Sequence, residues 1–456
     1  MLAELGSGVR EGSVSAVELV ELAYDRIDKL DGELNAVVAL RDRDRAIAEA
    51  RSIDPAGPLA GLPLLVKDNH DVAGMRTTYA STLFADAPPA ERDALVVERL
   101  RAAGAIVVGK SNLPEMAFAG FTDSDLFGQA RNPWDPAWSP GGSSGGAGAA
   151  LAAAMVPLAT ATDGGGSVRI PAAFCGLAGL KPTNGLVGRR PIHSWMDLST
   201  DGPMATSVDD CALLLEVMRG GTAGDVASIA EWTSRPAMPS RAIASPRTWD
   251  FGPLPPDVDA RYRAALASIE RDLGLPVEEV EPAALFGGLG DPGDDWFVLT
   301  GVEELTWIGR ARVEQHLERL SPPFRFAMES ALGVSVDRYV EARRNRFAYA
   351  ERMDALLGPD AVFVCPTMGV DGFSAAGDVP ATGEPGGGEA YNVSEANLTG
   401  HPALSLPAGV CANGIPFGLQ VTGPRWRDDL VLEFGRAWER ANPGPPTAPG
   451  YEPFGV

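Results

Sequence analysis

The chain has 456 residues, of which 45% are hydrophobic, so it is long and apolar enough to bury a substantial core. Its 61 acidic residues outnumber its 38 basic ones and give a formal net charge of −23, which argues against binding nucleic acid or an anionic membrane. The N-terminal residues contain no basic segment followed by an apolar one, so we expect no secretory signal.

In the first half of the chain, short apolar runs alternate with helical patterns. Ser15 and Glu18 form a capping-box pattern that predicts a helix to about Lys29. Such alternation is typical of an α/β fold with a mostly parallel mixed central sheet covered by helices on both faces. Further helices are expected at 91–103, 148–155 and 208–218, and strands at 62–66, 106–108 and 156–160.

The second half contains a long helical stretch. Residues 221–255 show no clear periodicity, whereas residues 294–357 are almost wholly helical, with a break at Pro322-Pro323. We predict one domain over residues 1–456, with a helical insertion at about 285–355, rather than three separate domains. The other expected elements are helices at 257–273 and 428–441 and strands at 361–365, 403–406 and 417–421.

Three features of composition bear on the fold and its location. Residues 374–390 are rich in Gly, Pro and Ala, which predicts a mobile surface loop. Residues 139–162 are uncharged, but they contain two prolines among many Gly and Ala residues, which favours a buried helix and a short strand over a membrane span. Four scattered cysteines without a CxxC pair predict free thiols in a reducing cytoplasm, with no zinc site.

Ser167 lies in a glycine-rich segment that suits acyl-transfer chemistry. In TDGGGSVRIP, Gly164, Gly165 and Gly166 precede this serine, and a short helix is expected after it. That arrangement can present main-chain N–H groups and a helix N-terminus to a developing oxyanion. A serine that caps a helix after a flexible turn gives the same local pattern.

A second glycine-framed serine, Ser143, lies in PGGSSGG, which composition alone would assign to a flexible linker. The segment also matches GxSxG, the nucleophile elbow of α/β-hydrolases. An elbow needs a preceding strand, but residues 132–140 carry three prolines and two tryptophans. It also needs a downstream acid and histidine, for which only His193, His316 and His401 are candidates, and neither His193 nor His316 has a distinctive setting. The elbow interpretation is therefore disfavoured.

Lys67 follows the apolar run at 62–66 and is one of only four lysines among the 38 basic residues. Burial disfavours the charged form of a lysine, and a neutral lysine can accept a proton, which arginine cannot. The alternative is a lysine that reaches the surface and pairs with Asp68.

Taken together, Lys67, Ser143 and Ser167 resemble the catalytic residues of the amidase signature family of Ser–cisSer–Lys hydrolases, and the resemblance extends over nearly the whole chain. It implies that Ser167 is the acyl-enzyme nucleophile and that Lys67 is the base. It further implies that Ser143, which follows a cis peptide bond, bridges Lys67 and Ser167. It also implies that the Gly164–Gly166 loop binds the oxyanion, although Gly164 replaces the Thr or Ile often found there.

Three further residues belong to this interpretation. Met116 matches a position that lines the substrate channel in relatives, although a core methionine would also explain it. Asp163 and Arg169 flank the nucleophile loop, and we expect them to brace it through a buried ion pair.

The resemblance implies hydrolysis of a small-molecule amide without a metal or organic cofactor. Two alternatives stay open: the glutaminase subunit of a tRNA-dependent amidotransferase, and a catalytically idle binding or scaffold subunit. Aromatic residues of the helical insertion suggest an aryl or alkyl amide. A homodimer through exposed apolar helix faces is a further expectation.

Overall fold

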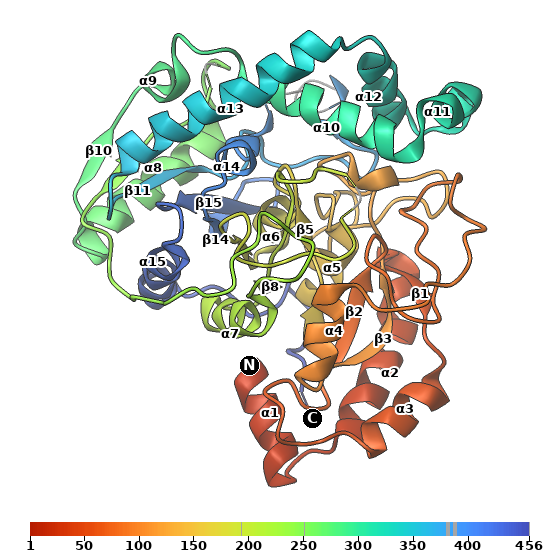
Figure 1. Ribbon diagram of the computed structural model, residues 1–456. Coiled ribbons are helices and arrows are strands. Elements are labelled where there is room, and N and C mark those ends of the chain that lie inside the picture. The colour runs from red at the N-terminus through yellow and green to blue at the C-terminus, as the bar shows by residue number, and fades with distance from the viewer. Residues whose placement is uncertain (193, 250, 380–383, 386–389, 456) are drawn as a thin grey trace.

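The computed structural model describes residues 1–455 except 193, 250, 380–383 and 386–389. Two mixed sheets lie at its centre, and helices surround them (Figure 1). The N-terminal helices and the smaller sheet form the lower part of the view. A row of helices between residues 292 and 357 lies across the top, above strands of the larger sheet.

The smaller sheet has the strand order β1-β3-β2-β4, and the larger has the order β10-β9-β11-β15-β14-β6-β8. Two short ribbons pair β5 with β7 and β12 with β13. The strands are β1 (Val37–Leu40), β2 (Pro63–Lys67), β3 (Ile106–Ser111), β4 (Leu158–Ala159), β5 (Thr162–Asp163), β6 (Ala178–Lys181), β7 (Thr200–Asp201), β8 (Met204–Ala205), β9 (Ala242–Ala244), β10 (Val277–Glu279), β11 (Val362–Pro366), β12 (Asp378–Val379), β13 (Glu384–Pro385), β14 (Ala403–Val410) and β15 (Pro416–Thr422).

Most helices cover the sheets, whereas the helices between residues 292 and 357 form a separate layer on one side. In chain order the helices are α1 (Leu2–Glu11), α2 (Ala16–Leu34), α3 (Arg43–Arg51), α4 (Leu95–Ala102), η1 (Glu115–Ala117), α5 (Gly145–Ala152), α6 (Arg169–Cys175), α7 (Val208–Met218), α8 (Pro256–Asp272), α9 (Pro282–Phe286), α10 (Pro292–Ile308), α11 (Arg310–His316), η2 (Leu317–Arg319), α12 (Pro322–Leu332), α13 (Val336–Leu357), α14 (Ser394–Thr399) and α15 (Asp428–Ala441).

The expected α/β class, with mixed sheets flanked by helices, is confirmed. The expectation of mostly parallel strands holds in the smaller sheet, where β2 runs parallel to both β3 and β4. It is wrong for the larger sheet, in which only the β10–β9 and β9–β11 pairs are parallel. The physical reason is clearest at β14 and β15, because their short connection leaves no room for a crossover and forces antiparallel pairing.

Patterns of neighbouring residues in the sequence correctly predicted the positions of most helices. The Ser15 side chain accepts the Glu18 N–H, and the Glu18 carboxylate accepts the Ser15 N–H, so the predicted capping box is confirmed. The predicted break at Pro322-Pro323 corresponds to the start of α12, since proline fits the first turn of a helix. The sequence analysis missed β9, a buried three-residue strand inside the irregular stretch 221–255. Such a strand is too short to show periodicity.

The predicted loop at 374–390 lies partly outside the described residues. Its described portion contains β12 and β13.

All four cysteines are buried and free. None of the helices in the described ranges is long and apolar enough to cross a membrane.

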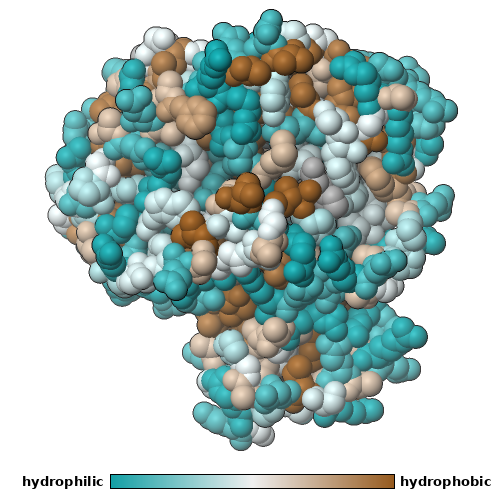
Figure 2. Space-filling model, viewed as in Figure 1, coloured by the Kyte–Doolittle hydropathy of each residue, from teal (hydrophilic) through white to brown (hydrophobic). Residues whose placement is uncertain are grey.

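The helices α10 to α13 pack in a second hydrophobic cluster, which also includes Ile243 on β9 and Phe363 on β11. Phe326, Val336 and Phe347 on α12 and α13 are nevertheless exposed. Figure 2 shows hydrophobic side chains near the upper edge of the molecule and in the middle of the same face, within a largely hydrophilic surface. The homodimer stays a prediction.

Candidate active site

Lys67 is the last residue of β2 and is fully buried. Its main-chain N–H donates to Thr160 Oγ1, at 2.8 Å, which fixes the end of the strand against β4. Three hydroxyl groups surround its Nζ: Ser143 Oγ at 2.7 Å, Ser144 Oγ at 2.9 Å and Thr162 Oγ1 at 2.8 Å. All of its hydrogen-bond partners are therefore uncharged hydroxyls.

The surroundings of Lys67 favour its neutral form. Burial lowers the pKa of Lys67 to about 7, although Asp163 and Asp201 act in the opposite direction. The alternative pairing with Asp68 is wrong, because Asp68 Oδ1 lies 2.9 Å from Nζ of another buried lysine, Lys110. Lys67 can therefore exchange a proton near neutral pH, as a general base must.

Ser143 follows a cis peptide bond after Gly142 and is completely buried. The linker interpretation of PGGSSGG is wrong, because residues 139–150 are all buried. A Cβ on Gly142 would lie 2.7 Å from the main-chain oxygens of Ala119 and Phe121, so the backbone packs too closely there for a side chain. Residues 132–142, which are all described, contain two isolated bridges, Asn132–Asp135 and Trp138–Ser374, but not the strand that the elbow would require.

Residues 164–168 connect β5 to α6 and form the predicted nucleophile loop. This loop carries Ser167, which is 7% exposed. Asp163 anchors this loop: its carboxylate accepts the Gly166 N–H at 2.8 Å and the Val168 N–H at 3.2 Å. Arg169 lies 2.8 Å from the same carboxylate, and both side chains are fully buried. Burial alone would raise the pKa of Asp163, but the Arg169 guanidinium holds it well below its usual range. The loop is thus fixed around a charged pair.

Not every glycine of the loop offers its N–H group to a ligand. The Gly166 N–H is already bonded to Asp163. Within the described ranges, no acceptor takes the N–H groups of Gly164, Gly165 and Ser167. These three amides are available to an oxyanion, whereas the sequence had suggested all three glycines.

The structure joins Lys67 to Ser143 directly, and it places Ser167 beside this pair through the backbone. The Ser144 N–H donates to the Ser167 main-chain oxygen at 3.3 Å. A hydrogen bond between the Ser143 and Ser167 hydroxyls is not present among the described contacts; catalytic bonds are often long without substrate. Ser144 and Thr162, both missed by the sequence analysis, also hold Lys67.

Ser167 opens on a cavity of about 990 Å³ between the nucleophile loop and the helices α10, α12 and α14. Its walls are mainly aromatic and aliphatic. Trp296, on α10, donates its Nε1–H to the Gly164 carbonyl at 2.6 Å and so ties the helical layer to the nucleophile loop. The apolar side chains of the wall are Phe118, Phe121, Ile170, Trp195, Phe251, Trp296, Phe297, Val298, Phe326, Val334 and Tyr391.

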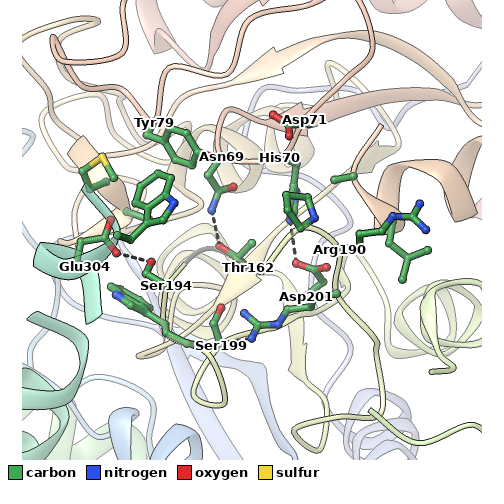
Figure 3. Close-up of a pocket in the computed structure, with 18 residues that line it drawn as sticks. Asn69, His70, Asp71, Tyr79, Thr162, Arg190, Ser194, Ser199, Asp201 and Glu304 are labelled. Carbon is green, nitrogen blue, oxygen red and sulfur yellow. Dashed lines mark hydrogen bonds and ion pairs between the residues drawn. The ribbon is translucent and has the colours of Figure 1, made fainter. Parts of the chain in front are cut away.

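Met116 lines a different and smaller cavity, of about 100 Å³, which Thr162 also lines. Figure 3 shows this cavity. Met116 is 5% exposed and belongs to the hydrophobic cluster of the helical layer. The cavity is polar: His70 Nε2 lies 2.8 Å from Asp201 Oδ1, and Asn69 donates to Thr162 Oγ1 at 3.3 Å. Met116 and Ser167 therefore face separate cavities.

The three histidines within the described ranges do not pair with Ser143 or Ser167. His70, which the sequence analysis did not consider, contacts Thr160 and Asp201. His401 is buried against Asp354, at 3.1 Å. His316 ends α11, and His193 lies outside the described residues. In the parts of the chain that are described, no histidine is bonded to Ser143 or Ser167, which leaves the elbow interpretation without its base.

Comparison with known proteins identifies the family to which the chain belongs. Residues 18–432 match the family model Amidase. A glutamyl-tRNA(Gln) amidotransferase subunit of Thermus thermophilus is 36% identical over 477 residues, which cover 96% of each chain. An acylamidase of Rhodococcus erythropolis is 32% identical over 470 residues, covering 96% of this chain and 95% of the relative. The solved structure of 6-aminohexanoate cyclic dimer hydrolase with its substrate has a TM-score of 0.86 and 28% identity, over 97% of each chain.

Proposed function

Because the chain belongs to the amidase family, we propose that it hydrolyses the amide bond of an apolar carboxylic amide through an acyl-enzyme on Ser167. The observation that carries the substrate class is the cavity over Ser167, which is walled by aromatic and aliphatic side chains. Within the described residues its charged lining side chains are all acidic: Asp291, Asp294 and Glu395. A substrate carboxylate would find no cation there.

In the proposed mechanism, neutral Lys67 accepts the proton of Ser143, which accepts that of Ser167. The Ser167 oxygen attacks the amide carbon, and the N–H groups of Gly164, Gly165 and Ser167 bind the negative oxygen. As the C–N bond breaks, the protons return in reverse order to the leaving nitrogen, which departs as the amine or ammonia. Water then attacks the ester carbonyl by the same route, releases the acid and restores Ser167.

The second candidate is the glutaminase subunit of a tRNA-dependent amidotransferase. The names of similar relatives favour it, since glutamyl-tRNA(Gln) amidotransferase subunits recur among them. Among the described residues, the lining of the cavity offers no cation to the α-carboxylate of glutamine, which would be buried among acidic and apolar groups. This argues against the second candidate even though the same acids suit the α-ammonium group of glutamine. The side chains of the proposed mechanism also come from this one chain, so we propose that it acts without a partner protein.

The two candidates predict different substrates for the isolated chain. We expect it to hydrolyse benzamide, phenylacetamide, short aliphatic amides and anilides with kcat/KM values at least about 100-fold above that for glutamine. The reason is that the α-carboxylate of bound glutamine would be left without a partner, and an unpaired buried polar group discriminates strongly between substrates. Ammonia or amine release by the purified protein is the measurement. Turnover of glutamine alone, and only after the other amidotransferase components are added, would establish the second candidate instead.

The pH dependence should follow the neutral fraction of Lys67. Because the base is active only without its proton and its pKa is lowered to about 7, we expect kcat/KM to rise with pH, with a midpoint near 7, and then to level off. His70→Gln is the control, because an imidazole is the alternative kind of base and His70 Nδ1 lies 3.1 Å from Thr160 Oγ1, which also accepts the main-chain N–H of Lys67. Loss of the pH limb in that variant would assign it to the histidine.

The bond from Trp296 to Gly164 should influence turnover. Trp296→Phe keeps an aromatic ring but removes the N–H donor, and we expect kcat to fall about fivefold, as for the loss of one hydrogen bond of about 1 kcal/mol. Trp438→Phe is the matched control, since the Trp438 indole donates to the Pro407 carbonyl at 2.9 Å in another part of the fold. Equal losses of kcat in both variants would indicate a general effect of destabilisation.

A further inference from the structure

Glu395, on the short helix α14, differs from the other buried acids of the molecule. It is 8% exposed and lines the cavity that contains Ser167. Its Oε1 accepts a hydrogen bond from the Thr248 hydroxyl. Its Oε2 has no hydrogen-bond partner among the described residues. A buried polar atom without a partner is uncommon in a folded protein and requires an explanation.

Other buried carboxylates show how such groups are normally satisfied. Both oxygens of Glu115 accept hydrogen bonds, from Ser81 and from Ser321. The unbonded Oδ2 of Asp210 lies 3.5 Å from the N-terminal ammonium group. Within the described part of the chain, the Oε2 atom of Glu395 has neither kind of partner. The atom is therefore suited to a donor that the ligand-free protein does not supply.

The position of Glu395 connects it with the reacting centre. Two residues earlier, the Val393 carbonyl accepts a hydrogen bond from Arg169 at 2.8 Å. The Val393 side chain packs so closely on Gly166 that a Cβ on that glycine would lie 2.5 Å from it. Helix α14 is thus held against the nucleophile loop, and Glu395 and Ser167 face one cavity.

The charges around this cavity define the kind of donor. Burial raises the pKa of Glu395, and the Asp291 carboxylate acts in the same direction. The Thr248 hydroxyl, a main-chain N–H and the charge of Arg169 act in the opposite direction, but the Arg169 guanidinium is already paired with Asp163. Asp294, at the same cavity, is already occupied by Arg338 at 2.6 Å. A positively charged ligand would relieve the repulsion between the acids, whereas an anion would increase it. The terminal torsion of glutamate is soft, so the carboxyl can turn toward such a ligand while Thr248 remains bonded.

We propose that Glu395 binds a basic amino group of the substrate, so that the preferred amides have an apolar body that ends in a primary or secondary amine. This inference rests on the proposed function, since it names a second part of the same substrate. The aromatic walls would contact the apolar body, and Glu395 would select the substrates that carry the amine.

The test uses linear ω-amino amides of increasing chain length, each paired with its methyl-terminated analogue of the same length. At the length that spans Ser167 and Glu395, we expect the amine to have a kcat/KM about 10- to 100-fold above its analogue, as for a hydrogen-bonded charge pair. Glu395→Gln, which keeps the shape and an acceptor for Thr248, should reduce that ratio at least about tenfold. Asp294→Asn is the matched control and should retain it, because Asp294 is 64% exposed and paired with Arg338.

The proposal is overturned if the methyl-terminated amides are hydrolysed as well as the amines at every length. It is also overturned if Glu395→Gln lowers kcat/KM equally for both members of a pair, as a purely structural residue would. The first comparison needs only the unaltered protein, so it decides the matter even if the variant does not fold. If neither series is hydrolysed, the proposed function fails, and calorimetric binding of the same paired amides then tests Glu395 independently.

Discussion

Replacing Ser167 by alanine is expected to lower amide hydrolysis on the order of 10⁴- to 10⁶-fold, because no other group can form the proposed acyl-enzyme. The fold should be unaffected: no hydrogen bond of the Ser167 hydroxyl is present among the described contacts, so its removal leaves no partner unsatisfied. The measurements are kcat with a neutral aromatic amide, the unfolding temperature, and labelling by a fluorophosphonate, which should occur only when Ser167 is present.

Ser330→Ala is the matched control for this variant. Ser330 lines the same cavity, but its hydroxyl donates to the Phe326 carbonyl within α12, so we expect a change in kcat of less than about threefold. Full activity of Ser167→Ala would refute the assignment of the nucleophile. An unaltered protein that is neither labelled nor active would support the idle binding or scaffold subunit instead.

Lys67→Ala and Ser143→Ala should each lower kcat about 10³-fold, which is the contribution usual for a general base. Since their Nζ and Oγ atoms lie 2.7 Å apart and are proposed to pass one proton, the double variant should be little worse than either single one. Independent roles would give a loss of about 10⁶-fold in the double variant. A double-mutant cycle on kcat, with the unfolding temperature of each variant, distinguishes these outcomes.

Lys67→Met belongs in the same series, because alanine leaves a cavity at a fully buried position and methionine largely fills it. Loss of activity in both variants at a normal unfolding temperature would locate the effect in proton transfer. Near-normal activity in Lys67→Met would contradict the role of Lys67 as the base.

Local patterns in the sequence predicted the elements that depend on local interactions. The Ser15 capping box and the last helix, at 428–441, agree with the structure because they rest on residues close together in the chain. Lys67 and Ser143 were recognised by their unusual settings and by family resemblance, and the structure brings them together. The partners of Lys67 could not be foreseen in the same way. Ser144 looks like part of a linker, and Thr162 falls between the strand expected at 156–160 and the glycine loop. Only the tertiary fold joins them.

The same limit applies to the details of the nucleophile loop. The sequence cannot show that the Gly166 amide is bonded to Asp163, because this depends on where the carboxylate turns after the strand ends. Nor can it show that Met116 lines a cavity other than that of Ser167, since the walls of both cavities combine residues from distant segments and share Ala117 and Trp195. Antiparallel pairing in the larger sheet likewise reflects the arrangement of whole strands and not their composition.

The nucleophile loop lies directly beneath two tryptophans. A Cβ on Gly164 would lie 2.1 Å from the Trp195 ring, and one on Gly165 would lie 2.4 Å from the Trp296 ring. Trp296 comes from the layer of helices that also forms the wall around the substrate. Substitutions that change substrate specificity are therefore constrained where the cavity wall contacts the nucleophile loop. Random mutagenesis of the glycines should yield inactive clones for steric reasons alone, whereas we expect substitutions of Phe326, which is 64% exposed at the cavity wall, to be tolerated more often. Recombination that exchanges the helical layer between homologues should preserve activity only where the incoming segment supplies a side chain that fits over this loop.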